Sequence, residues 1–194
     1  MKTGRVPRLL KRIIIGAGLI SADQLLKLWI FRFFRNSNVV LIPQVLRFHP
    51  VQNKNLNWIA SVADYKTTVI QMAVLQAAAV ILALLAYRYL AYCSGGRWER
   101  LLSKLFILFF VAGICGSTLD VMLWGGSLDF IRLFNWFTFD VKDIYLSASV
   151  LFLILYSLAY LKRYYRLDSQ QRKQLKNLQR IRQWIKAGFP VSQK

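Results

Sequence analysis

The chain has 194 residues, of which 56% are hydrophobic, and its 27 lysines and arginines outnumber its 8 aspartates and glutamates to give a formal net charge of +19. The hydrophobic residues gather in long runs and the basic residues flank them. Membrane topology and attraction to anionic lipid explain such a charge, so we expect membrane lipid and no nucleic acid as a partner.

Four apolar runs approach the roughly 20 residues that cross a hydrocarbon core. Lipid offers the backbone no hydrogen-bond partners, so each run is predicted to be a helix. The predicted spans are residues 12–34, 67–87, 101–123 and 144–161. A cleavable signal peptide is the alternative for the first run, but that run has no small-residue cleavage site and ends among phenylalanines and arginines.

The basic residues also predict the orientation. They precede the first span, flank the connection between the second and third spans, and fill the tail, which the positive-inside rule makes cytoplasmic. Most acids lie in or beside the other two connections: Asp64, Asp120, Asp129, Asp140 and Asp143. We therefore expect an all-α membrane protein with four transmembrane helices, both termini in the cytoplasm, and its polar chemistry on the extracytoplasmic side.

The first predicted span contains an acid and a base, Asp23 and Lys27, one helical turn apart. They share a helix face in the favourable order, with the acid before the base. Such a pair can neutralise itself inside a bilayer. Two interpretations stay open: an ion pair that fixes helix packing, or a pair that orients a substrate or loop.

The first outer loop, residues 35–66, is too long for a simple turn. Its Val39–Ile42 segment is β-prone, which predicts a small extracytoplasmic sheet or cap against the membrane. Asn53 begins an amide-rich stretch that by itself indicates a turn. His49 is the only histidine, so a histidine-rich metal cluster is excluded, and we interpret it as a loop residue before Pro50.

The second outer loop brings several carboxylates between the last two spans. If Asp129 and Asp143 converge, they can share a proton, one activating a water molecule while the other polarises a carbonyl. The alternative is that these acids cap and solvate helix ends. Spacing alone leaves both open.

The tail, residues 162–194, is predicted to be a basic cytoplasmic segment separate from the transmembrane domain of residues 1–161. Apolar residues recur in it at near-helical spacing: Leu175, Leu178, Ile181, Trp184 and Ile185. This pattern suits an amphipathic helix on the inner membrane surface, with a solvated tail as the alternative. Cys93 and Cys115 offer no outer-face disulfide pair.

A set of short motifs resembles the bacterial lipoprotein signal peptidase (signal peptidase II) family over residues 22–161. They are Asp23-Gln24-Leu25-Leu26-Lys27, Asn53, Asp120, Leu128-Asp129-Phe130 and Phe139-Asp140-Val141-Lys142-Asp143. The resemblance implies a membrane-embedded aspartic endopeptidase whose catalytic dyad is Asp129 and Asp143. It implies cleavage of prolipoproteins on the amino side of a diacylglyceryl-modified cysteine, without a metal or organic cofactor.

The resemblance also implies roles for other polar positions. Asn53, Asp23 and Lys27 match positions that support the site or the substrate, and Asp120 and Asp140 belong to the matching motifs. Three departures mark the chain as a divergent member. Ser117 and Val121 replace an asparagine and an arginine, and the segment after Asn53 differs throughout.

The third departure lies in the last motif. Asp140 and Lys142 replace an asparagine and a small residue, and the two changes can compensate each other in charge. We favour the interpretation that Lys142 extends to the membrane interface and has no catalytic consequence. The alternative functions are a non-hydrolytic relative that binds lipid-modified peptides or a membrane partner, and a small transporter subunit using Asp23 and Lys27.

Overall fold

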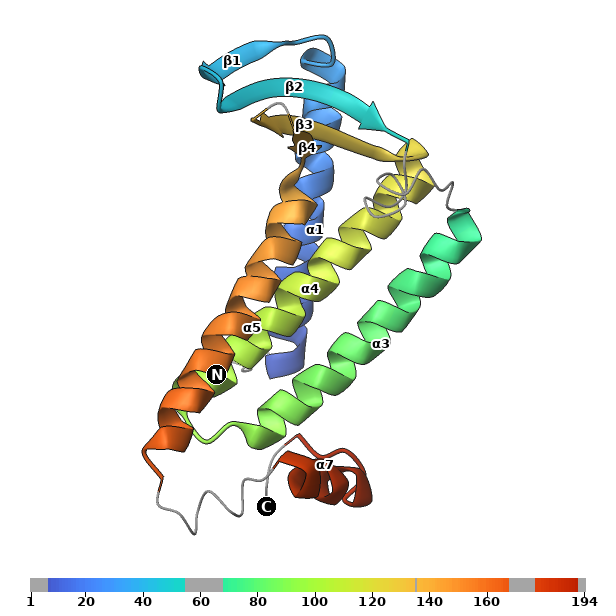
Figure 1. The fold of residues 1–194 in the computed structure, drawn as a ribbon. Helices are drawn as coiled ribbons and strands as arrows, with labels where there is room; N and C mark the ends of the chain where they lie inside the picture. Colours follow the sequence, from blue (N-terminus) through green and yellow to red (C-terminus); the bar gives the residue numbers. More distant parts are fainter. Residues whose placement is uncertain (1–6, 55–67, 135, 168–176, 192–194) are drawn as a thin grey trace, which may run out of the picture. The chain divides into compact units, whose positions relative to one another are not determined.

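The computed structural model describes residues 7–54, 68–134, 136–167 and 177–191. Four of its helices are long and apolar enough to cross a membrane (Figure 1). They are α1 (Arg8–Phe33), α3 (Val69–Cys93), α4 (Arg97–Trp124) and α5 (Val141–Tyr165). The four predicted spans are therefore confirmed as helices.

The helices extend beyond the predicted spans at most ends. α3 continues to Cys93 rather than residue 87, α4 begins at Arg97 rather than residue 101, and α5 runs over Val141–Tyr165 rather than residues 144–161. Hydropathy locates the part of a helix that fits the hydrocarbon core, whereas a helix continues through polar turns at both ends of that part.

The chain divides into two units: residues 1–78 with 111–146, and residues 79–110 with 147–194. The first unit contains α1, a small sheet, and the parts of α4 and α5 that adjoin the sheet. The candidate functional side chains all belong to this first unit.

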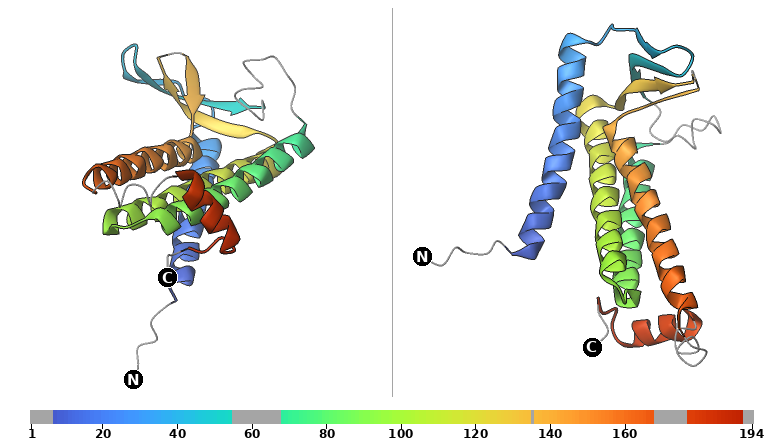
Figure 2. Two further views of the ribbon diagram at one scale, coloured as in Figure 1. Left: turned by 60° about the horizontal axis from the view of Figure 1, so that its bottom comes forward. Right: turned by 90° about the vertical axis from the view of Figure 1, so that its left-hand side faces the viewer.

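An antiparallel sheet of four strands, in the order β1-β2-β3-β4, belongs to the first unit. Strands β1 (Val39–Ile42) and β2 (Leu46–Asn53) come from the first connection, as predicted. Strands β3 (Ser127–Leu133) and β4 (Phe137–Phe139) come from the second, where no strand was predicted. Figure 2 shows β3 following α4 and β4 leading into α5. The sheet thus joins two connections that are far apart in the sequence.

Strand β2 has an irregularity at His49 and Pro50. The pairing of β2 with β3 shifts register between Phe48 and Val51. Proline cannot donate a ladder hydrogen bond, which favours such a bulge. The prediction that His49 is a loop residue was wrong, because it lies within β2.

Strand β3 holds the sheet against α1. Leu128 and Phe130 form a buried apolar cluster with Ile30 of α1. Alternate residues of a strand face opposite ways, so Asp129 and Ser127 share the other face. The apolar contacts therefore fix the direction in which Asp129 points.

A glycine pair turns the chain from α4 into β3. Gly125 has a φ of +63° and its N–H donates to the Val121 carbonyl at 3.2 Å, a glycine-terminated helix end. A Cβ at Gly126 would overlap the carbonyl oxygen of Asn53. Only glycine lets β3 start this close to the end of β2.

We expect Gly126→Ala to reduce the peptidase activity that the resemblance implies at least about tenfold. The added methyl group must push Asn53 away from β3, and displacements of about 1 Å have effects of this size or larger. The matched control is Gly18→Ala in α1, where a Cβ would meet nothing within 4 Å. Alanine there should be neutral or stabilise by about 0.5–1 kcal/mol. Cleavage rates and thermal unfolding of both variants test this; equal activity would contradict it.

In the second unit, a helix from the tail packs against the end of α3. Helix α7 (Asn177–Lys186) buries Trp184, whose ring centroid lies 5.3 Å from that of Tyr89. The predicted tail helix is thus present, although Leu175 lies outside the described residues. The same unit contains a partly buried ion pair, Glu99 with Arg163, at 2.7 Å.

Candidate active site

Asp129 is positioned by the pairing of β2 with β3. In this register Val51 lies opposite Asp129 and Asn53 lies opposite Ser127. The Asn53 amide donates to Asp129 Oδ2 at 3.1 Å, and the Ser127 hydroxyl donates to Asp129 Oδ1 at 2.6 Å. Both oxygens of the carboxylate are therefore held by side chains of neighbouring strands.

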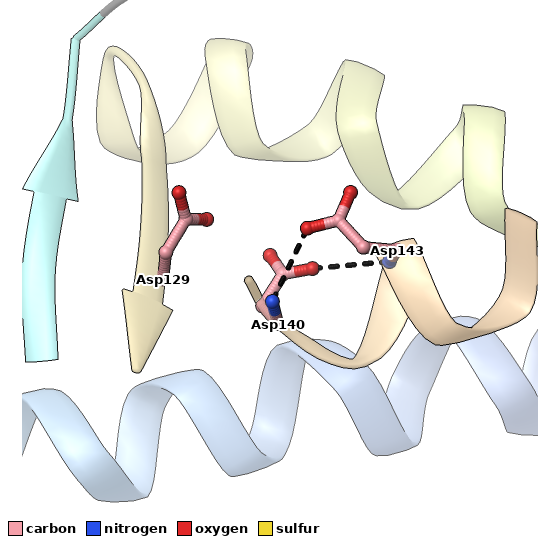
Figure 3. A group of neighbouring side chains, drawn as sticks. All are labelled: Asp129, Asp140 and Asp143. Carbon is pink, nitrogen blue, oxygen red and sulfur yellow. Dashed lines mark hydrogen bonds between the residues drawn. The ribbon is translucent and has the colours of Figure 1, made fainter. Parts of the chain in front are cut away.

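Asp140 and Asp143 begin helix α5 and cap it reciprocally. The N–H of Asp143 donates to Asp140 Oδ1, and the N–H of Asp140 donates to Asp143 Oδ2, each at 3.2 Å (Figure 3). This is the arrangement of a capping box, with Asp at the N-cap and at the third helical position. The capping interpretation therefore holds for Asp143, whereas Asp129 lies within β3 and caps no helix.

The same geometry brings the predicted dyad together. One carboxylate oxygen from each of Asp129, Asp140 and Asp143 lies within 4.8 Å of the others, and Figure 3 shows Asp129 facing the other two from β3. The Asp143 side chain is 40% exposed, whereas Asp140 is 0% exposed. Of the two acids at the start of α5, Asp143 is therefore the one that water or a substrate can reach.

Lys27 of α1 is the centre of a buried ionic network. Its ammonium lies 2.8 Å from Asp23 Oδ2, 2.7 Å from Asp120 Oδ2 and 2.7 Å from Asp140 Oδ2. All of these side chains are at most 1% exposed. The pair predicted in the first span thus becomes a link between α1, α4 and the start of α5.

Lys142 also lies inside this network, so the prediction that it extends to the membrane interface was wrong. Its Nζ lies 2.5 Å from Asp140, 3.1 Å from Asp120, 3.7 Å from Asp129 and 3.9 Å from Asp143. The side chain is 9% exposed. Four carboxylates hold this ammonium more strongly than the distant interface can.

Ser127 connects Lys142 to Asp129. The Lys142 ammonium donates to Ser127 Oγ at 2.6 Å, and that hydroxyl is 2.6 Å from Asp129 Oδ1. The same hydroxyl lies 3.0 Å from Asp140 Oδ2. Since a hydroxyl has a single proton, the shorter contact with Asp129 is the favoured donation.

The surroundings shift the pKa values of two acids that lie outside the helices, Asp129 and Asp140, in opposite directions. Burial raises the pKa of Asp129, although the ammonium of Lys142 and the donors Ser127 and Asn53 oppose this. Burial also acts to raise the pKa of Asp140, but Lys142 and Lys27 together hold it below its ordinary value. Asp140 therefore holds a proton less tightly than an ordinary aspartate, and Asp129 holds one more tightly.

Three carboxylates, two at the start of α5 and one on β3, lie close enough together to be considered as ligands of a metal ion. Lys142 Nζ lies between 2.5 and 3.9 Å from an oxygen of each of them. A divalent cation among these oxygens would be repelled by that ammonium at close range. The donor set with its lysine therefore does not suit a metal.

A cavity of about 440 Å³ opens beside the acids. Its lining is shared between the ends of α4 and α5, β4 and the acids, and includes Ser117, Val121, Phe139, Asp143 and Leu146. Ser117 Oγ accepts a hydrogen bond from the Gln76 amide at 2.9 Å. Ser117 and Val121, two of the positions where the sequence departs from the resembled motifs, thus line this cavity.

Every candidate residue from the sequence belongs to this one site: Asp23, Lys27, Asn53, Asp120, Asp129, Asp140 and Asp143. Sequence reasoning missed Ser127 and Gln24. Ser127 precedes Asp129 by two residues, the spacing that places strand neighbours on one face. Gln24, whose amide donates to Asp120 Oδ1 at 2.9 Å, had no signal beyond its place next to Asp23.

Two solved structures share this fold, and both are described as bacterial membrane enzyme structures by the in meso method. The one at 1.9 Å resolution has 20% sequence identity and a TM-score of 0.61, and the match covers 76% of this chain and 92% of that one. The one at 2.3 Å resolution has 19% identity and a TM-score of 0.60, covering 84% and 94%. At these identities the likeness is one of fold. No curated protein matches the chain.

The family comparison goes further. A model of the family described as signal peptidase (SPase) II matches residues 15–159, which include all four membrane-competent helices in whole or in large part and the entire cluster of acids and lysines. The resemblance seen in the short motifs is thereby confirmed. The chain is a multi-pass bacterial membrane protein that belongs to the signal peptidase II family of lipoprotein-processing peptidases.

Proposed function

We propose that the protein is an aspartic endopeptidase that removes signal peptides from diacylglyceryl-modified prolipoproteins, on the amino side of the lipidated cysteine. Its catalytic dyad is Asp129 and Asp143. The observation that supports this best is their convergence: oxygens of the two carboxyl groups lie within 4.8 Å of each other at the wall of the cavity. They come from separate elements, β3 and α5, with Asp143 exposed.

The two carboxyl groups share one proton in the active form. The ionised group takes a proton from a water molecule, whose oxygen attacks the scissile carbonyl carbon, while the protonated group donates to the carbonyl oxygen. The tetrahedral intermediate then breaks its C–N bond, and the amino group of the lipidated cysteine leaves with a proton from the dyad. The proton belongs to the pair, and its apparent pKa values are those of the pair.

The other polar residues support this pair. Asn53 and Ser127 orient Asp129 through its two oxygens. The ion pairs that Lys27 forms with Asp23 and Asp120 join α1 to α4. Asp140, the N-cap of α5, orients Asp143 through the reciprocal backbone bonds.

The location of the site suits a lipid-bearing substrate. The dyad lies near the ends of membrane-competent helices, so a lipid chain can stay in the bilayer while the peptide bond meets water and carboxylates. The basic residues at the opposite helix ends support a cytoplasmic location for both termini. We accordingly place the active site on the extracytoplasmic side of the bacterial membrane.

The decisive experiment is a cleavage assay of the purified full chain in lipid. The substrate is a prolipoprotein carrying the thioether-linked diacylglyceryl group, beside the same protein without lipid. We expect the lipidated form alone to shift on a gel, and mass spectrometry to find its new amino terminus at the modified cysteine. A product cut elsewhere, or cleavage of both forms, contradicts the proposed specificity.

The second candidate is a relative that binds lipidated peptides without cleaving them. It is favoured by the cavity lining, where Ser117 is engaged with Gln76 and Val121 offers no polar group to a substrate. Binding of the lipidated prolipoprotein by well-folded protein, with no product from several substrates, would establish this candidate in place of the peptidase.

A further inference from the structure

Lys142 and Asp140 form a buried ion pair immediately beside the proposed dyad. The Nζ–Oδ2 distance is 2.5 Å, and the two side chains are 9% and 0% exposed. They are two residues apart at the start of α5, so one short segment contributes both an extra anion and an extra cation to the site. Neither group faces water as a surface ion pair does.

The proposed dyad is within reach of both charges. Lys142 Nζ lies 3.7 Å from Asp129 and 3.9 Å from Asp143. Asp140 has an oxygen within 4.8 Å of both acids. At these distances a single uncompensated charge shifts the proton affinity of a carboxylate by about one pH unit or more.

The remaining charges nearby are already paired. Lys27 of α1 contacts Asp23, Asp120 and Asp140, and Asp120 of α4 is shared between the two ammonium groups. Removing Lys142 would leave Asp120 and Asp140 with Lys27 alone. Removing Asp140 would leave Lys142 with a surplus of positive charge toward Asp129 and Asp143.

We propose that Lys142 and Asp140 act as one compensated pair that positions the dyad and sets how readily Asp129 gives up its proton. Ser127 transmits the effect, because it accepts from Lys142 and donates to Asp129, each at 2.6 Å. Both members are positioning residues. The proposal rests on the proposed function, and it specifies how the charges around the proposed dyad are balanced.

The test is a double-mutant cycle with Lys142→Met, Asp140→Asn and the two combined, read as kcat against pH. Loss of the ammonium raises the pKa of Asp129, so the ascending limb of the kcat–pH profile should move to higher pH by about one unit. At pH values below this limb, activity should be about tenfold lower than in the wild type. Loss of the Asp140 charge should move the ascending limb to lower pH. The double variant keeps the net charge of the site, and its limb should return to the wild-type position.

Two further variants separate charge from packing. Lys142→Arg keeps the charge and should keep the wild-type profile. Ser127→Ala removes the connecting hydroxyl and should move the limb in the same direction as Lys142→Met, by a smaller amount. A wild-type profile in both Ser127→Ala and Lys142→Met would overturn the proposal, as would a double variant whose ascending limb does not return to the wild-type position.

Thermal unfolding gives a readout that does not need cleavage. Each single variant should melt below the wild type, and the double variant should melt above the less stable single variant. A double variant that melts below both singles contradicts the pair even if the chain cleaves nothing. A wild type that does not cleave contradicts the proposed function instead, so the two failures are distinguishable.

Discussion

Replacing Asp129 by asparagine should lower kcat for lipidated prolipoprotein at least about 1,000-fold while the protein stays folded. The amide has the shape of the carboxyl group and can still accept from Ser127, which lies 2.6 Å from Oδ1. It can neither take a proton from water nor share one with Asp143. Asp143→Asn should lose activity to the same extent, because it cannot share a proton with Asp129. It should also stay folded, because its amide oxygen can keep the bond from the Asp140 N–H.

The matched control is Glu99→Gln, another buried acid-to-amide change. Glu99 pairs with Arg163 at 2.7 Å in the second unit, outside the site. Breaking this partly buried pair should lower the free energy of unfolding by about 2 kcal/mol and leave kcat unchanged in protein that is still folded. Full activity in either dyad variant would refute the dyad, and equal loss in Glu99→Gln would attribute the effect to stability.

Lys27→Met should have the largest effect on stability. Its ammonium is the counter-charge of Asp23, Asp120 and Asp140, and the side chain is 0% exposed. Removing one partner of a buried ionic network typically destabilises by about 3–5 kcal/mol, because the remaining carboxylates lose their solvation without compensation. We expect the melting temperature in detergent to fall by about 10 °C.

The control for this variant is Lys162→Met. Lys162 lies exposed in the last turn of α5, so the same change of side chain removes a charge that water already solvates. Its melting temperature should stay close to that of the wild type. If the two lysine variants melt alike, Lys27 is not the centre of a stabilising network.

The sequence predicted the helices and the members of the site because both depend on strong local signals. An apolar run of spanning length can satisfy its backbone hydrogen bonds in lipid only as a helix. Acids beside such runs are costly, which indicates a structural or chemical role. The helix ends were less accurate, since the charged turns at Arg97 and Tyr165 lie outside the hydrocarbon-sized window.

The errors arose where partners are distant in the sequence. Lys142 stands at a predicted membrane boundary, where an exposed lysine is ordinary; its burial depends on Asp120 and Asp129, which reach it only through α4 and β3. Strand β3 is short, and its paired partner β2 lies in a different connection. Pairing of this kind is set by tertiary contacts more than by local propensity.

The shared sheet has a consequence for the synthesis and membrane insertion of the protein. Asn53 meets Asp129 across 76 residues of chain, and Asp143 follows still later, in the first turn of the last membrane-competent helix. A nascent chain that has emerged only as far as α4 holds Asn53 and Lys27 but neither dyad acid. With Asp129 and Asp143 as the proposed dyad, the site is therefore complete only after the first turn of the last membrane-competent helix has been made.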